Sequence, residues 1–73
     1  MSNTVKLKHD LTYEQECWLT ENIGPKLYHL HYKFGGERWH VVRDFDSKYS
    51  KRFDYYISFQ DERMATMFIL RWL

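Results

Sequence analysis

Three of the four histidines, His29, His31 and His40, lie in one short stretch on either side of a Gly35-Gly36 pair. Imidazole is the commonest metal ligand in proteins, and three imidazoles around an open position can hold zinc together with a water molecule. These residue types therefore raise a zinc site as one hypothesis. Whether the three rings meet depends on how the stretch folds.

The residues from Lys26 to Phe45 predict a β-hairpin, with Gly35-Gly36 as a two-residue turn. Facing residues would then have numbers that add to 71, which places His31 opposite His40. His29 and Arg38 fall on the same polar face, because side chains alternate along a strand. The other face is expected to cover the core and carries Tyr28, Leu30, Tyr32, Phe34, Trp39, Val41 and Phe45.

A helix is expected before the hairpin, from Tyr13 to Ile23. Thr12 and Gln15 have the spacing of a capping box, and Gly24-Pro25 supplies the stop. The sequence before this helix alternates, so residues 1–9 are expected to be either flexible or an additional edge strand.

A strand and a second helix are expected after the hairpin. The alternation from Phe53 to Phe59 predicts the strand, and Tyr56 lies on its outward side. Residues 61–73 predict the helix. The order is α-β-β-β-α in a single domain, residues 1–73. We therefore expect an α+β fold, a two-layer sandwich with an antiparallel three-stranded meander.

The composition restricts the class of protein. The one cysteine, Cys17, forms no internal disulfide, which favours a reducing compartment. No apolar run is long enough to cross a membrane, and the N-terminus lacks the apolar core of a signal peptide. We therefore expect a cytoplasmic protein with no membrane partner. The net charge of +1 gives no general attraction to nucleic acid.

The predicted open face of the sheet is the first candidate binding surface. Its cations, imidazoles and aromatic ring could contact a partner protein, and the same groups could stack and hold single-stranded nucleic acid. Nucleic-acid binding is therefore an alternative to protein binding, and zinc binding is a second alternative. The candidate residues of this face are His29, His31, Arg38, His40 and Tyr56.

The helices provide the second candidate surface, because each carries more apolar residues than one contact needs. Trp18 points away from the other apolar residues of the first helix. Met67 and Leu70 form a ridge opposite the expected core stripe of Met64, Ala65, Phe68, Ile69 and Trp72. Either the helices pack on each other and bury these residues, or Trp18, Met67 and Leu70 meet a partner protein or a second copy of the chain.

No phosphate-binding loop or nucleophile motif is present in the sequence. We therefore expect no enzyme and no cofactor. The C-terminal segment from Phe59 to Leu73 resembles the ending of small tailed-bacteriophage proteins of unknown function, in which an Ala-Thr-x-Phe-x-Leu-x-Trp-like helix closes the chain. This resemblance implies a virus-encoded accessory protein made in the bacterial cytoplasm. Small viral domains without a recognisable active site often act by occupying the surface of another protein, so we expect this one to engage a host or phage protein. The matching positions are Phe59, Asp61, Glu62, Ala65, Thr66, Phe68, Leu70 and Trp72.

Overall fold

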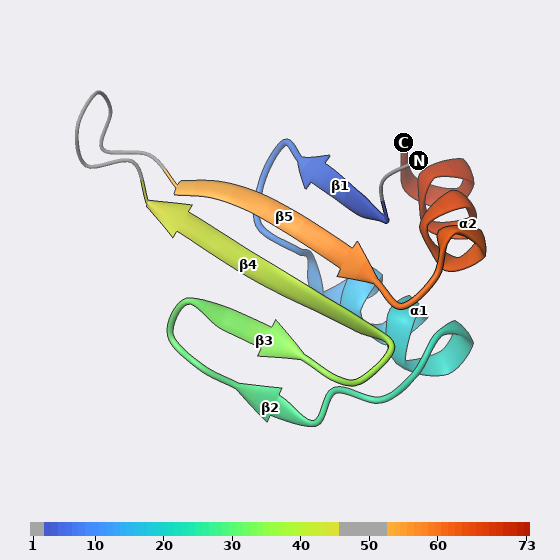
Figure 1. Ribbon diagram of the computed structural model, residues 1–73, viewed down its shortest axis with the longest axis horizontal. Coiled ribbons are helices and arrows are strands. Elements are labelled where there is room, and N and C mark those ends of the chain that lie inside the picture. Colours follow the sequence, from blue (N-terminus) through green and yellow to red (C-terminus); the bar gives the residue numbers. More distant parts are fainter. Residues whose placement is uncertain (1–2, 46–52) are drawn as a thin grey trace.

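The protein folds as a five-stranded antiparallel sheet with two helices, shown in Figure 1. This computed structural model describes residues 3–45 and 53–73, except for the side chains of Phe45 and Phe53. The sheet order is β1-β5-β4-β3-β2. The elements are β1 (Thr4–Leu7), α1 (Tyr13–Asn22), β2 (Tyr28–His29), β3 (Lys33–Gly35), β4 (Trp39–Phe45), β5 (Phe53–Phe59) and α2 (Glu62–Trp72).

The first helix begins and ends close to where its local signals predict. The Thr12 hydroxyl accepts a hydrogen bond from the Gln15 backbone, and the Gln15 side chain accepts one from the Thr12 backbone. This reciprocal pair is the capping box, which satisfies two N–H groups that a helix leaves unpaired. The helix ends at Asn22, with Ile23 as its C-cap, so the predicted helix is confirmed. The α+β class and the additional edge strand, β1, are confirmed as well.

The predicted turn of the hairpin is wrong by two residues. The Gly36 N–H donates to the carbonyl of Trp39 at 2.7 Å, so Glu37 and Arg38 form the turn between β3 and β4. Gly35 lies inside β3 with φ of 144°, and a Cβ there would lie 2.5 Å from the Cα of His40. Gly35 therefore allows a close approach of two backbones, whereas the sequence analysis assigned it to the turn.

The predicted single strand before the turn is also wrong, because it folds back on itself. The Leu30 N–H donates to the carbonyl of Lys33 at 2.7 Å, which puts His31 and Tyr32 at the tip of a hairpin between β2 and β3. The meander therefore has four consecutive strands, β2 to β5, rather than three. With β1 in front, the order is β-α-β-β-β-β-α, and only part of the predicted α-β-β-β-α order is correct.

The core lies between one face of the sheet and the two helices. Phe34 faces Val41 across β3 and β4, which shifts the predicted pairing by four residues. Because four is an even number, the shift leaves these strands with the same side chains inward. The core-forming residues are Leu7, Phe34, Trp39, Val41, Ile57 and Phe59 from the strands, with Leu19, Ile23, Ala65 and Phe68 from α1, its C-cap and α2.

The helices pack on each other as well as on the sheet. The ring of Trp18 from α1 lies edge to face against Phe68 and Trp72 of α2, with centroid distances of 6.2 and 6.5 Å. Trp18 is half-buried by these contacts. Ile69, which was predicted in the core stripe, is 42% exposed, and that part of the prediction is wrong.

Candidate partner-binding surfaces

The three histidines of the zinc hypothesis lie in three different places. His29 stacks on Phe34 at 5.0 Å on the side of the sheet that faces the helices. His31 lies at the tip of the β2–β3 hairpin, and His40 lies on the opposite, open face. Within residues 3–45 and 53–73, no three His, Cys, Asp or Glu side chains are grouped so that they could hold a metal ion. The predicted pairing of His31 with His40 is therefore wrong, and the zinc hypothesis fails with it.

The open face of the sheet keeps only two of its five predicted residues. His40 pairs with Ser58 and Tyr56 pairs with Val42, so the two side chains are diagonal neighbours on β4 and β5. Arg38 instead lies in the turn, where its guanidinium donates to the carbonyl of Ile23 at 3.3 Å. Arg38 therefore holds the end of α1 and does not extend the open face.

One further residue of this face, Tyr28, was predicted in the core, whereas Lys33 lies on the polar face as its alternation predicts. Tyr28 pairs with Gly35, which pairs with His40, so Tyr28 lies on the open face and not in the core. Lys33 lies on the same face and, after burial, is the second cause that lowers the pKa of His40. The extra turn at the tip of the β2–β3 hairpin reverses which residues of β2 face the core. The position of Tyr28 could have been predicted only by recognising this turn, and the turn residues His31 and Tyr32 include no glycine that would indicate it.

On the side of the sheet that faces the helices, the aromatic ring of Phe34 is covered by neighbouring side chains. Besides the stacked His29, two cations lie over Phe34, with Arg43 at 5.1 Å and Lys26 at 5.8 Å from the ring centroid. Arg43 also forms an ion pair with Asp10 at 2.9 Å. These side chains shield Phe34, which is only 3% exposed, so they stabilise the fold and the Phe34 ring is not available to a partner.

The outer side of α2 carries an apolar surface that nothing in the described structure covers. Leu70 is 82% exposed and Leu73 is 62% exposed, whereas Phe68 on the inner side is fully buried. Met67, Leu70 and Leu73 follow one another at three-residue spacing, so they form a continuous ridge along the helix. We call Met67, Leu70 and Leu73 the α2 ridge. Of the two alternatives left open for the helices, exposure holds for Met67 and Leu70, whereas Trp18 packs between the helices.

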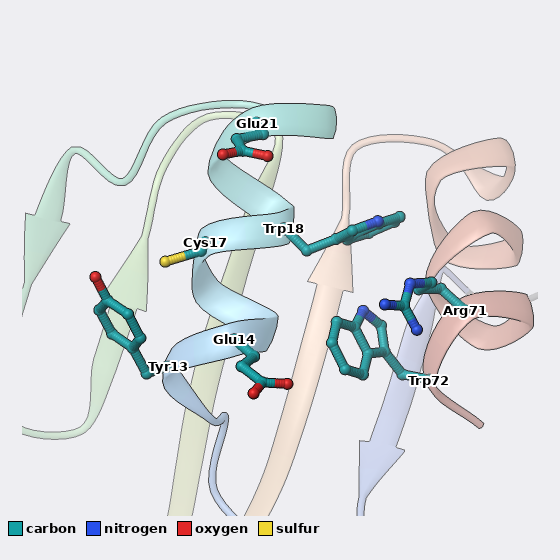
Figure 2. A pocket seen from close by; sticks show the side chains of 7 residues that line it. All are labelled: Tyr13, Glu14, Cys17, Trp18, Glu21, Arg71 and Trp72. Carbon is teal, nitrogen blue, oxygen red and sulfur yellow. The ribbon is translucent and has the colours of Figure 1, made fainter.

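A shallow groove of about 330 Å³ crosses α1 and reaches the last turn of α2 (Figure 2). Trp18 extends from α1 toward Trp72, while Cys17 points to the side of α1 that is away from α2. The guanidinium of Arg71 lies 4.4 Å from the ring centre of Trp72. The residues that line the groove are Tyr13, Glu14, Cys17, Trp18, Glu21, Arg71 and Trp72.

Two details of the groove concern its polar atoms. The indole N–H of Trp72 is buried and has no hydrogen-bond acceptor within the described part of the chain. The nitrogen edge of this ring faces Trp18, as Figure 2 shows, so the N–H lies against an aromatic face. On the other side of α1, a hydrogen bond with the Cys17 side chain is the main cause that raises the pKa of Tyr13.

The comparisons with known proteins add no family and no relative. No protein-family model matches the chain, and no curated protein or solved structure matches it. Within the described residues, neither helix is long and apolar enough to cross a membrane.

Proposed function

We propose that this protein is a non-enzymatic binding protein that engages another protein through the α2 ridge. One observation carries the proposal: Leu70 is 82% exposed on a helix whose opposite side, at Ala65 and Phe68, already fills the core. The fold does not need a large apolar side chain at this position. Burying such a side chain at an interface contributes about 25 cal/mol of binding free energy for each Å² removed from water. An exposed apolar ridge of this kind is therefore typical of a binding surface.

The nature of the partner follows from the resemblance of the C-terminal segment to tailed-bacteriophage proteins. The resemblance favours a host or phage protein that the chain meets in the bacterial cytoplasm. The same ridge could instead bind a second copy of this chain, because the ridges of two identical helices can pair about a twofold axis. The experiment below separates these two partners.

The experiment compares three tagged proteins as bait in a nuclease-treated bacterial lysate: the wild type, Leu70→Ser and Leu27→Ser. Leu27 is the matched control, because it is 60% exposed but lies before β2, at the opposite edge of the sheet from β1. We expect the wild type and Leu27→Ser to retain one stoichiometric protein and Leu70→Ser to lose it. Sedimentation of the purified protein tests the homodimer in the same way. If Leu70→Ser changes neither retention nor oligomeric state, the ridge has no such role.

Nucleic-acid binding by the open sheet face is the second candidate. The presence of Tyr28 and Tyr56 on one face with Lys33 and His40 favours it, because bases stack on aromatic rings and phosphates pair with cations. Asp44 and Asp54 face each other at one end of this face and oppose a polyanion. If the face binds nucleic acid, affinity for single-stranded oligonucleotides should fall steeply with added salt and fall again on Tyr56→Ala. A flat salt response would remove this candidate.

A further inference from the structure

The groove on α1 adjoins the α2 ridge. Arg71 lines the groove, and Met67 of the ridge precedes it by four residues, so the two side chains are neighbours on the surface of α2. One partner segment that lies on the ridge would therefore also reach the groove. The chemistry of the groove therefore restricts the same partner that the α2 ridge would bind.

The groove is acidic at the positions where a partner would contact it. The helix α1 carries Glu14, Glu16 and Glu21 and no basic residue. Lys26 lies 2.6 Å from Glu16 and neutralises it. Glu14 and Glu21 have no ion-pair partner in the part of the chain that the structure describes, and both line the groove. Among the described residues, the groove therefore carries two carboxylates without an ion-pair partner and one cation, Arg71, which leaves it with an excess of negative charge.

The spacing of these two carboxylates fits a regular partner segment. Residues seven apart lie on one side of a helix, about 10.5 Å apart along its axis. Figure 2 shows Glu14 and Glu21 near the two ends of the α1 face, with Cys17 and Trp18 between them. Basic side chains seven positions apart on a partner helix would have the same separation and could meet both carboxylates.

The aromatic part of the groove is in contact with a cation of the protein itself, Arg71. The Arg71 guanidinium lies over the Trp72 ring at 4.4 Å, which is the geometry of a cation–π contact. Trp18 presents a second indole beside it. With two carboxylates against the one guanidinium of Arg71, the groove favours ammonium or guanidinium groups over phosphates, so a basic segment fits it better than a nucleic acid or an anionic lipid surface.

We propose that the partner presents a basic amphipathic segment, with apolar residues on the α2 ridge and Lys or Arg side chains between Glu14 and Glu21. This inference rests on the proposed function of the ridge and specifies the chemistry of its partner. Charge complementarity of this kind contributes mainly to specificity and to the rate of association. The interaction should therefore weaken with added salt, whereas apolar binding to the ridge alone should not.

The test uses Cys17, the single cysteine of the chain, as a reporter at the edge of the groove that lies away from α2. The probe is a synthetic amphipathic helical peptide of about 15 residues. It has two lysines seven positions apart beside a leucine stripe, and a control peptide has glutamates in place of the lysines. The rate at which a thiol reagent modifies Cys17 is measured against peptide concentration. We expect the lysine peptide to slow the reaction at least about fivefold and the glutamate peptide to leave it unchanged.

Variants identify the groups responsible. The double variant Glu14→Gln with Glu21→Gln should weaken binding of the lysine peptide about 3- to 10-fold, because it removes two partly exposed ion pairs. Glu37→Gln, in the turn between β3 and β4, is the matched control and should change nothing. Leu70→Ser should weaken binding of the lysine peptide as well.

The outcomes separate this inference from the proposed function. Equal protection of Cys17 by the lysine and glutamate peptides, lost on Leu70→Ser, would overturn the basic partner and leave the ridge as a binding surface. No protection by either peptide would also overturn the groove inference, while the lysate comparison of Leu70→Ser with Leu27→Ser still decides the ridge.

Discussion

Replacing Trp18 with alanine tests whether this residue belongs to the packing between the helices or to a free surface. The substitution removes an indole that contacts Phe68 and Trp72. A fully buried tryptophan costs about 3–5 kcal/mol when it is truncated to alanine. Trp18 is only half-buried, so we expect a loss of about 2–3 kcal/mol in the free energy of unfolding.

This loss is large for so short a chain. At about 0.05–0.15 kcal/mol for each residue, a 73-residue domain has a free energy of unfolding of about 4–11 kcal/mol. With a urea slope of about 1 kcal/mol/M, the unfolding midpoint should fall by about 2–3 M. Circular dichroism is the appropriate signal, because the substitution itself changes the tryptophan fluorescence.

Leu70→Ala is the control on the exposed side of the helix pair, and it should change the free energy of unfolding by less than about 0.5 kcal/mol. A Trp18→Ala protein that unfolds at the same urea concentration as the wild type would refute the packing role. Trp18 would then return to the set of partner-binding candidates.

Three further perturbations test separate parts of the structure. Gly35→Ala should lower the free energy of unfolding by about 2 kcal/mol or more, because φ is 144° and a Cβ would meet the backbone of β4. Gly24→Ala should cost less, because the atoms nearest to a Cβ there are side-chain atoms of Arg38, at 3.1 Å or more, and not backbone, and urea unfolding of both variants checks this difference. Burial, together with the charge of Lys33, lowers the pKa of His40 below its ordinary value of about 6.5, so its contribution to stability is complete above that pH and is lost as the pH falls toward the lowered pKa. The wild type should therefore lose more stability than His40→Gln between pH 7.5 and 5.5, and equal losses would contradict this assignment. Thr12→Ala removes the capping box and should cost about 1 kcal/mol by urea unfolding, while Thr20→Ala, whose hydroxyl bonds to a backbone carbonyl inside the helix, should be nearly neutral.

Local signals were sufficient to predict the first helix. A capping box involves residues three positions apart, so Thr12 and Gln15 specify the helix start without information from the rest of the chain. The inward side of β3, β4 and β5 was predictable for a similar reason, because alternation along a strand does not depend on its exact partners. The α+β class follows from these two kinds of pattern.

The hairpin could not be predicted because glycine serves two purposes that look identical in a sequence. A Gly-Gly pair can form a turn, or it can let two backbones approach, and Gly35 does the second. The hairpin between β2 and β3 turns at His31 and Tyr32, which carry no turn signal. The predicted cluster of histidines depended on both turns, so it failed with them.

The excess of apolar residues on both helices was visible in the sequence, but its fate was not. Trp18 is covered by α2, whereas Leu70 remains exposed, and the relative position of the two helices makes this difference. Amphipathic patterns record only that a side chain is apolar. Which of two apolar stripes is buried depends on tertiary packing.

The pairing of β1 with β5 has a consequence for the order in which the chain can fold. Thr4 faces Ser58, and their hydroxyl oxygens are 2.9 Å apart, although they are 54 positions apart in the sequence. The hairpins from β2 to β5 join strands that are close in the sequence, whereas the β1–β5 ladder joins two strands with all the other strands and α1 between them. Contacts of such long range slow the folding of small domains. During synthesis, β1 must therefore wait without its partner strand until β5 has left the ribosome.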